Sequence, residues 1–575
     1  MHFFLISIKK YDKIEIDFGG DSMNDKLKEL AELMFPGIDK SVEDYEKMYP
    51  ERKLEEGARV TRFAPSPTGF VHMGSLLSAF EDYKAAKDTN GVFYLRIEDT
   101  DSKRTVENGI VGILNDLKNF DIIPDEGMID EEHSIGEYGP YIQSERKEIY
   151  HAFAKDLVLR GLAYPCFCSS EELDEIREIQ ELNKERIGYY GSFAKCRSLS
   201  VDEAIEKIKN GEEFTVRLKS PGDFNKKITL HDEARGDIEF PENDLDIVII
   251  KSTDKLPTYH FAHLVDDHLM HTTHIMRGEE WIASFPIHDQ LFEIFNFPKP
   301  KYVHLGVVMK IDEEGTRRKL SKRKDKEASV EFYHKEGIPK EAVKLYLMTI
   351  ANSNFEEWFL ENPDSDLSEF KFDFKKISAS GTLFDVEKLL NISKNYFSKL
   401  TANEIYDNLL VWTKEFDEEF YNVLVNNKEY AISVFNIERG GVKPRKDYTS
   451  YKSIRNFVFY MFDELFVNPD YGWNKITDKE EIKNILNTYV DKYMDFTDQE
   501  IWFNKIKEMC DELGYASNMK EYKKNPELFK GNVADVSGVL RIALTSLSNT
   551  PDLFLLMKLL GEDKVKERFL KCINN

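Results

Sequence analysis

The sequence lacks the features of an exported or membrane-spanning protein. It has five cysteines in 575 residues, too few and too scattered for the disulfide framework of a secreted scaffold. It has no run of about 18 apolar residues that could cross a membrane, and the apolar cluster at residues 3–8 is too short for a secretory signal. We therefore expect a protein of the reducing cytoplasm without membrane contact.

Positive charge is also scarce. The 79 Lys and Arg residues against 105 Asp and Glu residues give a formal net charge of -26. A uniformly acidic surface repels phosphate, which argues against non-specific clamping of nucleic acid. Residues 317–326 are the exception, because they hold seven basic side chains and a single acid. Either this segment meets a polyanion, or it is a solvated loop.

The chain is long enough for several folded domains, roughly four at on the order of 150 residues each. An apolar fraction of 41% and an aromatic fraction of 13% can build sizeable cores. From Val60 onward, short apolar runs alternate with helical patterns, which predicts a parallel sheet with crossover helices. The charge-rich residues 166–240 then suggest an insertion between two halves, and amphipathic helices dominate beyond about residue 380. Residues 1–57 are charged and suggest an appendage.

The first candidate site is the turn between a strand and a helix at residues 62–75. Free backbone N–H groups and the helix dipole both point at such a turn, which makes it an anion site. Gly74 lets a ligand approach the backbone, and His72 supplies a side-chain donor beside it. From these residues alone, a phosphate site and a plain structural turn both remain open.

A second candidate is the acidic end of the apolar strand that precedes Glu98. Open α/β sheets bind ligands at the carboxyl ends of their strands, so Glu98 could receive an ammonium group. The alternative is that Thr100 or Asp101 caps the helix that follows.

The third candidate lies in the basic segment, where Lys319 and Lys322 flank Ser321. Two lysines three residues apart can wrap a polyphosphate and follow its charge into a transition state. Together with the turn at residues 62–75, this segment suggests a nucleotide site built from two distant parts of the chain.

These segments resemble the signatures of a known enzyme family. Residues 72–75 (His-Met-Gly-Ser) resemble the HIGH signature of class I aminoacyl-tRNA synthetases, and residues 319–323 (Lys-Leu-Ser-Lys-Arg) resemble their KMSKS signature. Longer strings are similar to the bacterial-type glutamyl-tRNA synthetases, at residues 62–69, 96–101, 257–260, 275–281, 384–389 and 540–545. The sequence departs from this pattern at Ser75, which replaces the last His of HIGH, and at His263, where we expect Asn beside the substrate pocket.

The resemblance implies an α/β Rossmann-like catalytic domain with an inserted acceptor-binding domain, followed by an all-α anticodon-binding region. The expected parts are an N-terminal extension (1–57), two halves of the catalytic core (58–165 and 250–310), a connective insertion (166–249), a stem-contact region with the KMSKS-like loop (311–400) and an α-helical anticodon-binding domain (401–575). Residues 1–22 lie outside the resemblance, and we expect them to be dispensable, with Met23 as the true start of translation.

The resemblance also assigns roles to single residues. Glutamate presents two carboxylates and one ammonium, so its pocket needs cations and an anion. The positions that match the glutamate contacts of the family are Arg62, Ala64, Ser66, Glu98, Tyr259 and Arg277. Those that match its ATP site are Thr68, His72, Gly74, Ser75, Lys319, Leu320, Ser321, Lys322 and Arg323, with His72, Gly74, Lys319 and Lys322 as the catalytic set. Arg445 matches a contact to the third anticodon base, the alternative being a solvated arginine.

We expect two metal ions, Mg²⁺ and Zn²⁺. Mg²⁺ that bridges the phosphates of ATP is implied by the chemistry and needs no dedicated protein cage. Cys166, Cys168 and Cys196 offer thiolates of the kind that zinc prefers, and some members of the family carry a zinc on such cysteines and a tyrosine. Ala194 occupies the family's tyrosine position, and the nearest tyrosines are Tyr189 and Tyr190. Tyr190 or a water is the candidate fourth ligand of a structural Zn²⁺. Three cysteines packed as small apolar residues are the alternative.

The function that the resemblance implies is that of a glutamyl-tRNA synthetase, an ATP-dependent ligase that acts as a monomer. It would activate L-glutamate to glutamyl-adenylate and pass the acyl group to the 3' end of tRNA(Glu), with tRNA(Gln) left open as a second substrate. A glutamyl-queuosine-type synthetase and a non-catalytic tRNA-binding paralogue are the alternatives. The helical region after the KMSKS-like segment argues against the former, and the presence of His72 and Lys322 argues against the latter.

Overall fold

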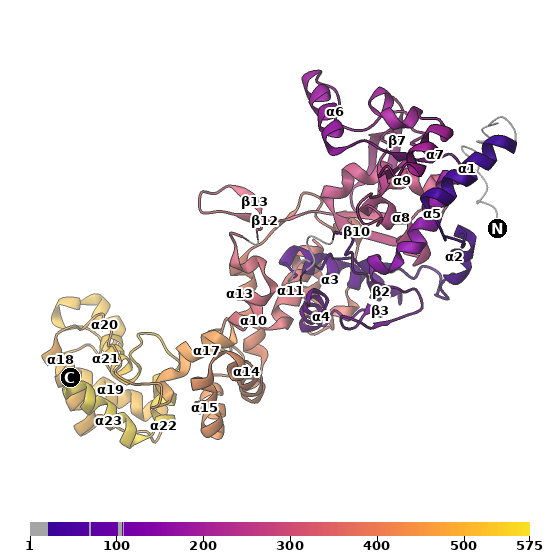
Figure 1. Cartoon of the computed structure of the whole chain (residues 1–575). Coiled ribbons are helices and arrows are strands. Elements are labelled where there is room, and N and C mark those ends of the chain that lie inside the picture. The colour runs from indigo at the N-terminus through magenta and orange to yellow at the C-terminus, as the bar shows by residue number, and fades with distance from the viewer. Residues whose placement is uncertain (1–20, 68–70, 102–105, 107, 322, 575) are drawn as a thin grey trace. The chain divides into compact units, whose positions relative to one another are not determined.

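The computed structural model describes residues 21–67, 71–101, 106, 108–321 and 323–574 (Figure 1). The expectation for residues 1–20 lies outside the described residues. The chain divides into two compact units, the first running to Glu331 and resuming for Leu347–Phe384, the second comprising Phe332–Tyr346 and the chain from Asp385 onward. The boundary expected between residues 400 and 401 therefore falls inside the second unit.

Parallel strands form the centre of the first unit. Strands β1 (Val60–Phe63), β2 (Val92–Leu95) and β3 (Glu126–Met128) pair in parallel, and β4 (Ser134–Ile135) adds an antiparallel edge. Strands β10 (His274–Gly278) and β11 (Lys301–Leu305) are parallel as well, and the N–H of Thr273 donates to the carbonyl of Val60 at 3.0 Å, which places β10 beside β1. The predicted α/β core with a parallel sheet is confirmed.

Helices connect these strands. Helix α3 (Met73–Lys87) joins β1 to β2, α4 (Gly109–Asn119) lies between β2 and β3, α8 (Tyr259–Leu269) precedes β10, and α9 (Phe285–Ile294) joins β10 to β11. Helix α3 is buried on several faces, so that Glu81 and Asp82 lie inside the protein together with the apolar Leu76 and Phe80. The carboxyl ends of β1, β2 and β10 and the N-terminus of α3 all face the site described below.

Most of the segment expected as an insertion forms a small structure of its own. Strands β5 (Ala163–Cys166), β6 (Thr215–Leu218) and β9 (Val248–Ile250) make an antiparallel sheet, and α6 (Ser170–Leu182) and α7 (Val201–Lys209) lie in the connection from β5 to β6. The hairpin of β7 (Lys227–Asp232) and β8 (Gly236–Pro241) instead joins the core sheet, because Asp232 pairs with Tyr302 of β11. One hairpin of the expected insertion therefore belongs to the core sheet.

The described part of the N-terminal extension packs against the first unit rather than standing apart as an appendage. Helix α1 (Asp21–Met34) contacts α5 (Lys147–Leu159) and α7, and α2 (Val42–Met48) follows it. The leucines at positions 27 and 30 of α1 are buried, and Lys209 of α7 pairs with Glu29 at 2.6 Å. The three-residue spacing of the leucines forms one apolar stripe, and a stripe of that kind needs a partner surface.

The remaining strands and the second unit complete the chain. Strands β12 (Val308–Ile311), β13 (Arg317–Lys319) and β14 (Thr382–Leu383) form a small sheet that carries the KMSKS-like segment. In the described part of the second unit there are helices and short helical turns but no strand: α13 (Val386–Lys399), α14 (Ala402–Phe416), α15 (Glu418–Asn426), α16 (Lys428–Phe435), α17 (Tyr451–Val458), α18 (Lys479–Thr488), α19 (Gln499–Leu513), α20 (Met519–Lys524), α21 (Val533–Thr545), α22 (Leu553–Leu560) and α23 (Glu562–Asn574). All of these helices except α20 contribute residues to one apolar core. None of the helices in the described ranges is long and apolar enough to cross a membrane.

Candidate active site

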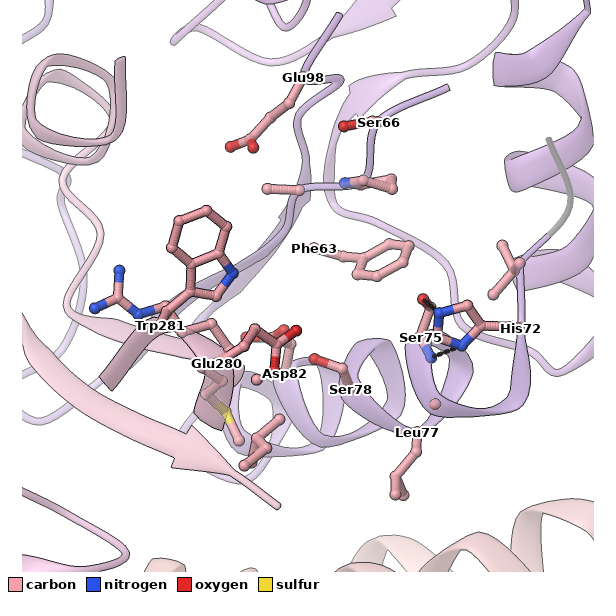
Figure 2. Close-up of a pocket in the computed structure, with 18 of the residues that line it drawn as sticks. Phe63, Ser66, His72, Ser75, Leu77, Ser78, Asp82, Glu98, Glu280 and Trp281 are labelled. Atoms are coloured by element: carbon pink, nitrogen blue, oxygen red, sulfur yellow. Dashed lines mark hydrogen bonds between the residues drawn. The ribbon is translucent and has the colours of Figure 1, made fainter. Parts of the chain in front are cut away.

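A cavity of about 840 Å³ opens in the first unit where the ends of the core strands meet α3 (Figure 2). Eleven of the residues expected at the site line it: Arg62, Ala64, Ser66, His72, Gly74, Ser75, Glu98, Tyr259, Arg277, Lys319 and Leu320. Ser321 and Arg323 are described but do not line it, and Thr68 and Lys322 lie outside the described residues. The fold thus brings four separate segments of the sequence to one cavity.

The N-terminus of α3 forms one wall of the cavity. His72 is its N-cap residue, and Nδ1 of the ring accepts the N–H of Ser75 at 2.9 Å. The other ring nitrogen lies 3.1 Å from Oγ of Ser75, so the ring spans the first turn (Figure 2). A Cβ at Gly74 would lie 3.1 Å from Cε1 of this ring, so any larger residue would press on the His72 side chain. The positive end of the helix dipole therefore faces the cavity, as an anion site requires.

Arg62 and Arg96 share one buried carboxylate. Nε of Arg62 donates to Oδ1 of Asp267 at 3.1 Å, and Nη1 of Arg96 donates to the same oxygen at 2.9 Å. Burial alone would raise the pKa of Asp267, but the two arginines outweigh it and hold this pKa well below its usual range. Arg62 lines the cavity with its charge already compensated by Asp267.

Arg277 lines the cavity, and its hydrogen-bond partners among the described residues are neutral histidines. Its Nε donates to Nε2 of His304 at 3.0 Å, and its Nη1 donates to Nδ1 of His288 at 2.9 Å. Burial is the main cause that depresses the pKa of both histidines, and for His288 the shift is large. The buried Nη2 atom has no hydrogen-bond partner among the described residues. No carboxylate of the described residues forms an ion pair with this guanidinium, so its positive charge suits a ligand carboxylate.

Glu98 supplies the negative charge at the same end of the cavity, where Figure 2 shows it near Ser66. Nη2 of Arg96 donates to Oε1 of Glu98 at 3.1 Å, and burial raises the pKa of Glu98 in spite of that arginine. A ligand ammonium group would stabilise the ionised carboxylate. The N-cap residue of α4 is Asn108, and the alternative that Thr100 or Asp101 caps a helix directly after it falls on residues 102–105, which lie outside the described residues.

The KMSKS-like segment is braced by an acid that we did not predict as functional. Both Nη atoms of Arg318 donate to Asp325, at 2.6 and 2.7 Å, and the N–H of Ser321 donates to the same carboxylate at 2.9 Å. The hydrogen bonds from Arg318 are the main reason why the pKa of Asp325 lies far below its usual range. One of the seven basic side chains therefore serves the loop itself, while Lys319 lines the cavity.

Several cavity residues escaped the sequence prediction. Glu280, Trp281, Ser78 and Asp82 meet at one part of the wall (Figure 2), and the ring of Trp281 packs on Tyr259 with centroids 4.0 Å apart. Asp82 is 1% exposed, its Oδ1 has no hydrogen-bond partner in the described ranges, and burial raises its pKa well above the usual value. The sequence signal that could have identified Asp82 is the pair of consecutive acids, Glu81 and Asp82, in the helix that follows the turn.

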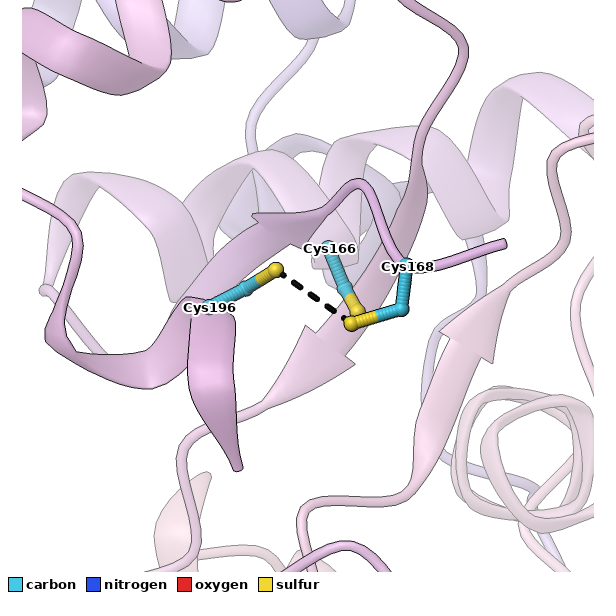
Figure 3. Close-up of side chains that lie close together, drawn as sticks. All are labelled: Cys166, Cys168 and Cys196. Atoms are coloured by element: carbon cyan, nitrogen blue, oxygen red, sulfur yellow. Dashed lines mark hydrogen bonds between the residues drawn. The ribbon is translucent and has the colours of Figure 1, made fainter. Parts of the chain in front are cut away.

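The three cysteines of the insertion come together as expected (Figure 3). Their Sγ atoms lie within 4.8 Å of one another, and Cys168 and Cys196 are 3.6 Å apart. The tyrosine beside them is Tyr189, whose hydroxyl lies 3.3 Å from Sγ of Cys168. The prediction of Tyr190 as the fourth ligand is wrong, because extended backbone turns that side chain away and its hydroxyl donates to the carbonyl of Arg186 at 2.8 Å.

In the second unit, Arg445 is held in place rather than freely solvated. Its Nε donates to Oδ2 of Asp447 at 2.5 Å, its Nη2 donates to Oδ1 of the same residue at 3.1 Å, and its Nη1 donates to the carbonyl of Thr550 at 3.3 Å. Of the aromatic side chains of this region, Tyr460 and Phe462 are buried at 1% and 2% exposure, and Phe457 is partly buried.

Comparison with known proteins assigns the chain to a family of enzymes. The family described as tRNA synthetases class I (E and Q), catalytic domain, matches residues 59–390, which include all the predicted residues that line the cavity. Fold and site together define a class I aminoacyl-tRNA synthetase. The glutamate–tRNA ligases of Clostridium perfringens (strain SM101 / Type A) and Acetivibrio thermocellus are each 48% identical to this chain, over 547 and 548 residues, and the matches cover 95% of this chain and 99% and 100% of those proteins. The chain belongs to the glutamate–tRNA ligase family.

A solved relative supports the same assignment. The crystal structure of a glutamate tRNA ligase from Elizabethkingia meningosepticum CCUG26117 in complex with its amino acid matches with a TM-score of 0.70 at 26% identity, over 90% of this chain and 99% of that one.

Proposed function

We propose that this chain activates L-glutamate with ATP and Mg²⁺ and transfers the glutamyl group to the 3' end of tRNA(Glu). The observation that carries the proposal is that one cavity combines groups suited to a polyphosphate with groups suited to an acidic amino acid. The helix N-terminus at His72 and the ammonium group of Lys319 suit a polyphosphate, while Arg277 and Glu98 suit the charges of an amino acid with an acidic side chain.

The proposed reaction has two steps. An oxygen of the glutamate α-carboxylate attacks the α-phosphorus of ATP, the bond to the β-phosphate oxygen breaks, and pyrophosphate leaves with that electron pair. A terminal ribose hydroxyl of the tRNA then attacks the acyl carbon and releases AMP. The protein contributes position and charge: the N–H groups of α3 and the side chains of Lys319 and Lys322 would face the phosphates as negative charge develops there.

The charge of Arg277 favours glutamate over glutamine. Its free N–H groups can form two parallel hydrogen bonds to a carboxylate. The amide of glutamine offers one acceptor and places a donor against the guanidinium, so one contact is lost and a repulsive one is added.

A charging assay tests this function and separates the alternatives. We expect purified protein to attach radiolabelled glutamate, and not glutamine, to tRNA(Glu). Charging of separately purified tRNA(Gln) decides whether the chain has one or two tRNA substrates. Binding of tRNA without charging would instead favour a non-catalytic paralogue, and charging confined to tRNAs that carry queuosine would favour a glutamyl-queuosine-type synthetase.

We also propose a structural Zn²⁺ on Cys166, Cys168 and Cys196, with Tyr189 as the fourth ligand. The three sulfurs lie close enough to share one ion, and zinc prefers such a set of thiolates. Elemental analysis of protein purified without chelator tests the site. We expect close to one zinc per chain, lost in Cys196→Ser and kept in Tyr190→Phe, while a content below about 0.2 would contradict the proposal.

The other expectations follow from the same function. We propose that the chain works as a cytoplasmic monomer, that residues 166–249 bind the acceptor end of the tRNA and residues 311–400 its stem, and that residues 401–575 bind the anticodon. Arg445 is the proposed contact to the third anticodon base, and its hydrogen bonds to Asp447 support it because they would hold the guanidinium in one orientation.

A further inference from the structure

A chain of hydrogen bonds between buried side chains connects Arg277 to Asp232 in the β7–β8 hairpin. Oδ2 of Asp232 accepts a hydrogen bond from Nδ1 of His304 at 2.7 Å and another from the N–H of His304 at 3.0 Å. Nε2 of the same ring accepts from Nε of Arg277 at 3.0 Å. Asp232 and His304 are both fully buried, so water does not compete for these contacts.

The hydrogen bonds of Asp232 determine which nitrogen of His304 carries the proton. Burial would raise the pKa of Asp232, but the hydrogen bonds from His304 outweigh it and the pKa is lowered, which keeps this residue a carboxylate. A carboxylate only accepts, so Nδ1 of His304 carries the hydrogen and Nε2 presents a lone pair. An arginine only donates, so that lone pair is what Arg277 needs. In the opposite tautomer two N–H groups would face each other and push the guanidinium away.

The same hairpin reaches the core at a second point. Oδ1 of Asp232 accepts from the N–H groups of Ala234 and Arg235, at 3.0 and 2.9 Å, which fixes the turn. Arg235 then donates from Nε to the carbonyl of His304 at 3.1 Å and from Nη2 to Oε2 of Glu279 at 2.8 Å. Glu279 is next to Glu280, which lines the cavity. The turn is therefore anchored on β11 and on the residue that follows β10, the strand that carries Arg277.

We propose that Asp232 and His304 are positioning residues for the substrate arginine, and that the turn of the β7–β8 hairpin sets the orientation of Arg277 toward the glutamate carboxylate. This inference rests on the proposed function, because it concerns how well that function selects glutamate. It assigns a role in amino acid recognition to a hairpin in the segment expected to bind the tRNA acceptor end.

Asp232→Asn tests the proposal in the full-length protein. The asparagine amide has one acceptor and one donor, so it cannot accept from both His304 and the turn, and the tautomer of His304 is no longer fixed. In charging of tRNA(Glu) we expect KM for glutamate to rise about tenfold or more and KM for ATP to stay within about threefold. Asp237→Asn is the matched control, because Asp237 lies on the same hairpin but pairs with His231 on the exposed surface, and we expect both constants to be unchanged there.

Circular dichroism reports whether Asp232→Asn folds. If it does not, a second pair of variants tests the same proposal. His304→Gln keeps an acceptor that can reach Arg277, whereas His304→Phe removes it, so only the latter should raise KM for glutamate strongly. Equal effects of the two variants, or equal rises in KM for glutamate and for ATP, would overturn the proposal and indicate a purely structural role. A wild-type chain that does not charge tRNA(Glu) would overturn the proposed function and this inference with it. An active wild type with an unaffected Asp232→Asn variant would overturn the inference alone.

Discussion

Replacing Arg277 with glutamine removes the charge on which the proposed glutamate pocket depends. An arginine has five N–H donors. One is bound to His304 and one to His288, which leaves three for a ligand, and a bidentate contact to a carboxylate uses two of them. Each such charge-assisted hydrogen bond contributes about 1.5–3 kcal/mol, and a glutamine amide restores one neutral bond of about 1 kcal/mol. The net loss is about 3 kcal/mol, or somewhat more than a hundredfold in affinity.

The assay is pyrophosphate exchange in the presence of tRNA, with glutamate varied at saturating ATP. We expect KM for glutamate to rise about a hundredfold in Arg277→Gln and about tenfold in Arg277→Lys, which keeps the charge but not the fork. Arg160→Gln, a change in an exposed pair with Asp156, serves as the control and should behave as wild type. A KM for glutamate within threefold of wild type in Arg277→Gln would refute the reasoning, provided that circular dichroism shows a folded variant.

Three further predictions concern charge in and around the cavity. Asp267→Asn should lower the free energy of unfolding by about 3–5 kcal/mol, measured by urea denaturation, because it leaves Arg62 and Arg96 buried without their shared carboxylate. Asp82→Asn should stabilise the protein increasingly as pH rises above the ordinary pKa of an aspartate, about 3.9. Burial raises the folded pKa of Asp82, so the wild type loses stability as pH rises from that ordinary value toward the raised pKa; a pH-independent difference in melting temperature would contradict this. Lys322→Ala should lower adenylate formation by about a hundredfold while tRNA affinity, measured by filter binding, stays within a few-fold; equal losses in both would contradict this.

The sequence predicts the cavity well because its residues lie in short, chemically distinctive strings. The turn at residues 62–75 and the basic segment at residues 317–326 carry charge and backbone features that need no tertiary knowledge. The Arg277 position was found through the resemblance, and its availability to a ligand became visible only in the fold. Its partners His288 and His304 lie 11 and 27 residues away along the chain, and nothing in the local sequence marks them as partners.

The errors have physical causes as well. Spacing could not choose between Tyr189 and Tyr190, because adjacent residues in extended backbone point in opposite directions and a single step decides which hydroxyl meets the sulfurs. The packed extension was missed because its short helices gain their stability from a tertiary surface, here α5 and α7. Asp325 looked like an exception within a basic run, whereas in the fold its carboxylate closes the loop.

A crystal structure with a non-hydrolysable glutamyl-adenylate analogue tests the central claim most directly, because that molecule joins the two ligands that the cavity is proposed to hold side by side. We expect the side-chain carboxylate within about 3.2 Å of a guanidinium nitrogen of Arg277, the ammonium group beside Glu98, and the phosphate at the N-terminus of α3 near His72. An analogue bound elsewhere, or bound in this cavity with its carboxylate away from Arg277, would contradict the account.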